Sequence, residues 1–185
     1  MTRIVTALLI SVPIAVCALV LLVFGSAMPD SPPTLEELQK DFVSRRSDLE
    51  TILRMSEEDT AFPRIAPDFI VSGMRSYMYG DPQNPMSTKR WEDYRKLFAR
   101  NGIKLGVQRW NNDIFVIVNS EGILNRGHSV GYLHCASALP SNVDGYEPCT
   151  GIDPSQKPRA ASRRIENHFH KLDGNWYAFD EDANE

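Results

Sequence analysis

The stretch Gly127–Gly131 reads Gly-His-Ser-Val-Gly, and its residue types resemble a catalytic motif. Gly-x-Ser-x-Gly is the nucleophile elbow of many hydrolases, where small flanking residues allow a strained turn that exposes the serine oxygen. The acid and base of a triad with Ser129 follow in a suitable chain order, as Asp144 or Asp153 and then His168 or His170. The motif therefore raises the hypothesis of a small hydrolase.

The sequence around this motif argues against that hypothesis. Residues 122–126 form a poor buried strand, and the preceding chain lacks the alternating strands and helices that carry nucleophile elbows. A glycine-rich turn that enters a strand is the favoured interpretation. We therefore assign no catalytic residue, and Ser129 remains the alternative.

The four histidines, at positions 128, 134, 168 and 170, are the second set of residues that could do chemistry. Residues an even number apart on one strand share a face, so His168 and His170 form one pair, and His128 and His134 form another. Three or four imidazoles could bind zinc if these strands paired, although the sequence does not fix the pairing. In the favoured interpretation Phe169 faces the core and its flanking histidines face solvent, so no metal ligand and no cofactor are predicted.

Cys135 and Cys149 are the two cysteines outside the apolar N-terminal run. An even pair of thiols in an exported domain is commonly joined, because the compartment is oxidising. We predict a disulfide between Cys135 and Cys149 that fixes the intervening loop to the end of a strand. Two free buried thiols are the alternative, since a bridge requires Cα atoms within ~7 Å.

The elements that must position these residues begin with two helices. Thr34-Leu-Glu-Glu37 reads as a capping box, and apolar residues at helical spacing continue to about Arg54 or Ser56. Ser87 or Thr88 begins a second helix, which ends at Asn101-Gly102. Five strands follow in a β-rich remainder, at about 103–110, 114–119, 129–135, 163–172 and 176–180.

Helices followed by a meander of strands predict an α+β fold, with two helices packed on an antiparallel sheet of about five strands. Prolines and glycines between the helices leave room for at most a short strand near residues 69–72. Residues 137–162, rich in Pro, Ser, Gly and Asp, are expected to be a long loop. The aromatic residues of these elements are interpreted as core and rim side chains rather than a ligand platform: Trp91, Tyr94, Trp110, Trp176 and Tyr177.

The N-terminal run at residues 4–24 is long enough to span about 30 Å of hydrocarbon as a helix. Its length favours a retained transmembrane anchor, and a cleavable signal peptide ending near Ala27 is the alternative. Arg3 before the run and acidic residues after it place the remainder outside the cytoplasm. We thus predict an anchor and tether at residues 1–29 and a single extracytoplasmic domain at residues 30–185.

Charge limits the partners of that domain. Arg3 is the one charged residue among the first 29, so the other 156 residues carry a formal charge of about −5. A mildly acidic domain has no general attraction for phosphate backbones, and no nucleic acid is predicted as a partner. The basic stretch Lys157-Pro-Arg159 with Arg163-Arg164 could receive an acidic partner, but a solvated loop is favoured.

Short hydrophobic and turn-forming motifs across residues 42–180 resemble a group of uncharacterised bacterial exported or lipid-anchored domains with no assigned activity. They comprise Phe42 with Arg45 or Arg46 and Leu49, Arg64-Ile65, Trp91-x-x-Tyr94, Leu97-Phe98, Ser120-x-Gly122, Gly131-Tyr132 and Gly174-Asn175-Trp176-Tyr177. The chain departs from the group at Val130, where a lysine is usual, and at His134, which replaces an aromatic residue. The resemblance implies an exported domain and no particular chemistry.

The sequence therefore predicts a noncatalytic binding or accessory domain, held at the membrane by residues 4–24. The tether between the run and the first helix can reach at most ~30 Å, so the expected partner is a protein near the membrane surface. A small hydrolase that uses Ser129 or a histidine-bound metal is the alternative function.

Overall fold

The computed structural model describes residues 31–110, 112–123, 126–137, 149 and 164–184. The chain divides into two compact units, residues 1–31 and residues 32–185, and the fold below is that of the second unit. Among the described residues, no helix is long and apolar enough to cross a membrane. The predicted span at residues 4–24 lies outside them and stays a prediction, as does the predicted domain boundary.

Helix α2 (Leu35–Glu58) begins with the predicted capping box. The backbone N–H of Thr34 donates to the Glu37 carboxylate at 2.8 Å, and the N–H of Glu37 donates to the Thr34 hydroxyl at 3.3 Å. Two orphan donors of the first turn are thereby satisfied. One apolar face of the helix is buried, and it comprises Leu38, Phe42, Leu49, Ile52, Leu53 and Met55.

Helix α3 (Thr88–Arg100) is also confirmed, with Ser87 as its N-cap. Its buried face consists of Trp91, Tyr94, Leu97 and Phe98. Gly102 follows the helix with φ +64°, a conformation that glycine adopts without steric cost. Arg45 of α2 donates to the backbone oxygen of Asn101 at 2.8 Å, so this polar residue within the α2 pattern ties the two helices together.

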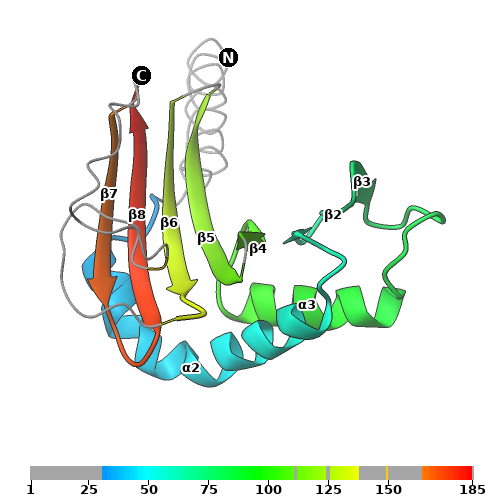
Figure 1. Ribbon diagram of the computed structural model, residues 1–185, viewed down its shortest axis with the longest axis horizontal. Helices are drawn as coiled ribbons and strands as arrows, with labels where there is room; N and C mark the ends of the chain where they lie inside the picture. Colours follow the sequence, from blue (N-terminus) through cyan, green and yellow to red (C-terminus); the bar gives the residue numbers. More distant parts are fainter. Residues whose placement is uncertain (1–30, 111, 124–125, 138–148, 150–163, 185) are drawn as a thin grey trace, which may run out of the picture. The chain divides into compact units, whose positions relative to one another are not determined.

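The strands form one antiparallel sheet, in which eight are found within the described residues (Figure 1). They are β1 (Arg64–Ile65), β2 (Phe69–Ser72), β3 (Arg75–Met78), β4 (Gly106–Trp110), β5 (Asp113–Ile123), β6 (Arg126–His134), β7 (Arg164–Lys171) and β8 (Trp176–Asn184). Their order across the sheet is β3-β2-β1-β4-β5-β6-β8-β7. The predicted fold class, two helices on an antiparallel sheet, is thus confirmed.

The sheet differs from the prediction in strand number and in order. The predicted five strands correspond to β4 to β8, while β1 and β3 were not expected, because one has two residues and the other is a polar edge strand. The predicted meander is wrong in its last step, since β8 lies between β6 and β7 rather than beyond β7 (Figure 1).

The two helices cover one face of the sheet, with α2 in contact with β4, β5, β6 and β8 (Figure 1). Side chains that point to this helix side form the main core. One row of paired residues crosses the whole sheet on that side, namely Tyr77, Ile70, Ile65, Val107, Val116, Tyr132, Ala178 and His170. Ile65, Val116 and Tyr132 are fully buried there.

The opposite side of the sheet, the far face, is apolar in one half. A second cluster on it contains Leu133, Cys135, Tyr177 and Phe179, against which Phe115, Ile117, Cys149 and Phe169 pack. The cluster includes no residue of α2 or α3. Strand β5 therefore contributes to both sides, with Ile114 and Val116 in the main core and Phe115 and Ile117 packed on the second cluster.

Candidate functional site

The serine motif lies within strand β6 rather than on a turn. The Ser129 hydroxyl is 3.1 Å from the hydroxyl of Ser120, its partner on β5. Gly131, at the end of the motif, allows close packing, since a Cβ there would lie 2.1 Å from the backbone oxygen of Val116. Gly131 thus serves the close pairing of β5 and β6, and the predicted turn is replaced by a continuous strand.

The predicted base of a triad does not lie near Ser129. Strand β8 separates β6 from β7, and Ser129 is paired with Glu181, which in turn is paired with Asn167. His168 is one position further along β7 and therefore points to the opposite side of the sheet. Asp144 and Asp153 lie outside the described residues. The geometry expected of a nucleophile and its base is not assembled here.

The four histidines share the helix side of the sheet but do not converge. The Nε2 atom of His128 is 2.7 Å from a carboxylate oxygen of Asp180 on β8, and His168 is paired with the same Asp180 from β7. His134 lies six residues along β6 from His128, or about 20 Å. His168 and His170 are exposed, as predicted. No three His, Cys, Asp or Glu residues in the described part of the chain are placed to hold a metal ion.

His134 has a distinct environment. Its ring meets the Trp176 ring edge-on, with centroids 4.9 Å apart, and Trp176 donates its indole N–H to Glu50 at 3.0 Å. Burial lowers the pKa of His134, and the carboxylates of Glu50, Glu57 and Asp113 oppose this effect. The imidazole therefore packs as an aromatic ring against Trp176.

Cys135 and Cys149 lie at disulfide-bonding distance, with sulfur atoms 2.12 Å apart and Cα atoms 5.0 Å apart. Cys135 is fully buried at the end of β6, and Cys149 packs on the same far-face cluster. This proximity meets the geometric requirement on which the predicted bridge depended. A bond between the two cysteines would fix residue 149 against the far face.

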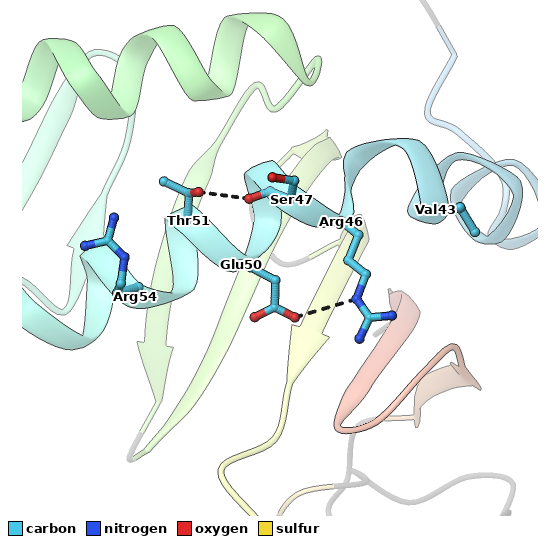
Figure 2. A pocket seen from close by; sticks show the side chains of 6 residues that line it. All are labelled: Val43, Arg46, Ser47, Glu50, Thr51 and Arg54. Atoms are coloured by element: carbon cyan, nitrogen blue, oxygen red, sulfur yellow. Dashed lines mark hydrogen bonds and ion pairs between the residues drawn. The ribbon is translucent and has the colours of Figure 1, made fainter.

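An open hollow of about 710 Å³ runs along α2, lined by Val43, Arg46, Ser47, Glu50, Thr51 and Arg54 (Figure 2). The Arg46 side chain turns toward Glu50, and the Thr51 hydroxyl donates to the backbone oxygen of Ser47 at 2.8 Å (Figure 2). All six residues belong to one helix, and Val43 is 81% exposed. Among the described residues no second element lines this hollow, so the hollow described is an open polar surface of α2.

The other half of the far face, on β1 to β4, carries a mixed patch that we call the open patch. Its members are Arg64, Phe69, Val71, Met78, Gln108 and Trp110. Strand pairing places them together, since Val71 and Gln108 flank Arg64, and Phe69 is paired with Met78. Trp110 is 60% exposed and Met78 is 59% exposed, so large apolar side chains face solvent here.

Trp110 is the exception to the prediction that the aromatic residues are core and rim side chains. Trp91 and Trp176 are almost fully buried, at 1% and 2% exposure, and Tyr94 and Tyr177 are buried as well. One sequence signal for the open patch is the alternation along its strands. Arg64 precedes buried Ile65, and Gln108 and Trp110 share the face opposite to that of buried Val107. Strand β1 was not predicted, and because it pairs with both β2 and β4, the sequence alone did not bring the residues of these strands together.

The basic stretch at residues 157–164 lies almost wholly outside the described part of the chain, which includes only the backbone of residue 164.

Comparisons of the chain with protein-family models, with curated proteins and with solved structures found no match. The resemblance to exported domains with no assigned activity stays a prediction. The function must therefore be argued from the geometry of these surfaces.

Proposed function

We propose that the chain is a membrane-tethered, extracytoplasmic, noncatalytic binding domain whose partner is a protein near the membrane surface. The apolar run at residues 4–24 and its flanking charges support the anchor and its orientation. The proximity of Cys135 and Cys149 is compatible with an oxidising compartment outside the cytoplasm.

The observation that carries the binding function is the open patch. Trp, Met and Arg are enriched in protein interfaces, and Trp and Arg contribute most often to their binding energy. The patch combines all three types, with Trp110 and Met78 more than half exposed and Arg64 between them. On a side of the sheet where neither α2 nor α3 packs, these side chains form a surface that a partner can cover.

The alternative function, a small hydrolase, has lost its geometric support. Ser129 and His168 point to opposite sides of the sheet, and Ser129 is hydrogen-bonded to Ser120 within two paired strands. A metal-dependent variant requires three or more converging ligands, whereas His128 pairs with Asp180 and His134 packs on Trp176. No observation favours either variant over binding.

Site-specific photo-crosslinking of the full chain in its own cells tests the proposal. A benzophenone amino acid in place of Trp110 is expected to give one discrete protein adduct after irradiation. The adduct should sediment with membranes and be degraded by protease added from outside the cytoplasmic membrane. A second substitution in the patch, Met78→Asp, should abolish it, because a charge at the centre of an apolar contact is costly to desolvate.

The matched control carries the benzophenone at Val43, which is also exposed but lies on α2. An adduct of equal yield at Val43 and Trp110 would reflect collisions and contradict a specific patch. The absence of any adduct at Trp110 would contradict it as well. An adduct protected from external protease in sealed cells would reverse the proposed orientation.

A further inference from the structure

Arg64 is the charged residue of the open patch, and its guanidinium lies within the patch rather than beyond it. It donates to the side-chain oxygen of Gln108 and, at 3.4 Å, to the backbone oxygen of Leu105. Its Cζ atom lies 5.8 Å from the centre of the Phe69 ring. The side chain is thus held on the sheet surface by neutral groups of β2, of β4 and of Leu105, which directly precedes β4.

Within the described part of the chain, no carboxylate pairs with the positive charge of Arg64. Among the described residues it forms no ion pair, and Asp68 acts on it only through a longer-range Coulomb interaction. Arg64 is partly buried, and its buried Nε atom has no hydrogen-bond partner within the described structure. Removing an unpaired charge from water is costly, and a carboxylate that arrives with a partner would compensate that charge.

We infer that the partner of the open patch is a polypeptide segment that presents an aspartate or glutamate to Arg64, with apolar side chains on either side of it. The flanking side chains would cover Trp110 and Met78, which lie on the two sides of Arg64 along the strands. This inference rests on the proposed binding function and specifies the chemistry of its partner.

Two properties of the patch favour a polypeptide over other anions. Phosphate-rich surfaces are usually bound by several cations, whereas Arg64 is the one charged member of the patch. The remaining members are apolar or, in Gln108, a neutral amide. A single carboxylate between apolar side chains matches one guanidinium in an apolar surround, and arginine binds carboxylates through paired N–H donors.

Peptide selection on the full-length protein in lipid nanodiscs tests the inference. The probe is a phage-displayed library of random twelve-residue peptides. Selection on the native protein is expected to enrich peptides that contain Asp or Glu beside aromatic or aliphatic residues. Selection on Arg64→Gln should lose the acidic enrichment, and a Glu→Gln version of a selected peptide should bind the native protein about tenfold more weakly.

Two further variants, Arg75→Gln and Arg64→Lys, serve as controls for Arg64→Gln. Arg75→Gln removes an exposed arginine of the neighbouring edge strand β3, one that points to the other side of the sheet, and should keep the acidic enrichment. On Arg64→Gln, the Glu and Gln peptides should bind equally, which isolates the pairing from any loss of stability. Arg64→Lys keeps the charge and should retain part of the preference.

The outcomes separate the two proposals. If the selected peptides need Trp110 for binding but are not enriched in Asp or Glu, the inference of a carboxylate in the partner is wrong and the proposed binding function still stands. An acidic preference lost in Arg75→Gln but kept in Arg64→Gln would overturn it too. If no selected peptide depends on Trp110, or none is enriched at all, both the inference and the patch as a binding surface are contradicted.

Discussion

His134 packs against Trp176, and its burial lowers the pKa of the imidazole. The folded state therefore resists protonation more than the unfolded chain does. The stability that this neutral ring contributes is present above the unfolded pKa, about 6.5, and is lost as the pH falls through the lower folded pKa. Acid should weaken the contact between β6, β8 and α2 at this position.

The variant His134→Phe tests this linkage because it keeps an aromatic ring on Trp176 and removes the titrating nitrogen. Urea unfolding of the native protein and of the variant, measured from pH 8 to pH 5, should give curves that diverge as the pH falls. The variant should lose less stability toward acid, since its ring does not take up a proton.

His170→Phe is the matched control, because His170 is exposed on β7. Its unfolding free energy should follow that of the native protein across the same pH range. If His134→Phe also follows the native curve, the imidazole does not couple folding to pH and the predicted linkage is wrong.

The exposure or pairing of a single residue was predictable from the sequence where one local rule decides it. Exposure of His168 and His170 followed from the alternation around Phe169, and the proximity of Cys135 and Cys149 confirms the geometric condition for their bridge. Trp110 was not predictable in this way, because its exposure depends on which side of the sheet the helices cover. The same dependence hid Arg64, whose charge has no ion-pair partner among the described residues.

At the scale of elements, Arg90 joins the two helices. Its guanidinium donates to Asp59 at 2.7 Å, to Glu58 at 2.8 Å and to the backbone oxygen of Met55 at 3.0 Å. The Tyr94 hydroxyl donates to the same Asp59 at 2.9 Å. A cation at the end of α2 also interacts favourably with the helix dipole, so this network holds the end of α2 against α3.

Arg90→Gln should lower the free energy of unfolding by about 2 kcal/mol, because it removes three charge-assisted hydrogen bonds and leaves Asp59 without its cation. Denaturation by urea, followed by helix circular dichroism, measures the loss. Lys89→Gln is the control: its ion pair with Asp93 is exposed and should be worth less than ~1 kcal/mol. Equal losses in the two variants would show that the Arg90 network adds nothing beyond a surface charge.

The helices were predictable with nearly correct ends, because the capping box at Thr34 and the stop at Asn101-Gly102 are local signals. The strands were predictable where they are long and apolar. Strand β1 has two residues between prolines, and β3 is largely exposed, so neither carries a clear periodic pattern. The position of β8 inside the sheet depends on tertiary pairing, which no local pattern encodes.

At the scale of the whole molecule, a bond between Cys135 and Cys149 would close a loop between the end of β6 and a residue 14 positions further along the chain, on the far face. A closed loop of this length reduces the entropy of the unfolded state by an amount worth about 3 kcal/mol. The double variant Cys135→Ser, Cys149→Ser should lose about that much stability, and reductant should have no further effect on it.

Mass spectrometry of unreduced, alkylated protein from its native compartment checks the bond directly. A linked peptide that contains both residues is the expected result, and a reductant should lower the stability of the native protein toward that of the double variant. Alkylation of both cysteines in the unreduced sample would contradict the bond and would weaken the proposed extracytoplasmic location with it.

Strand β8, the last of the described strands, lies inside the sheet, between β6 and β7. Trp176, Ala178 and Phe179 from this strand complete both hydrophobic clusters, so neither cluster closes until β8 is available. A nascent chain from which β8 has not yet emerged therefore holds β6 with one unpaired edge. Closure of the two clusters must wait until residues 176–184 are free to pair, and in that interval the unpaired edge and the open apolar surface favour aggregation.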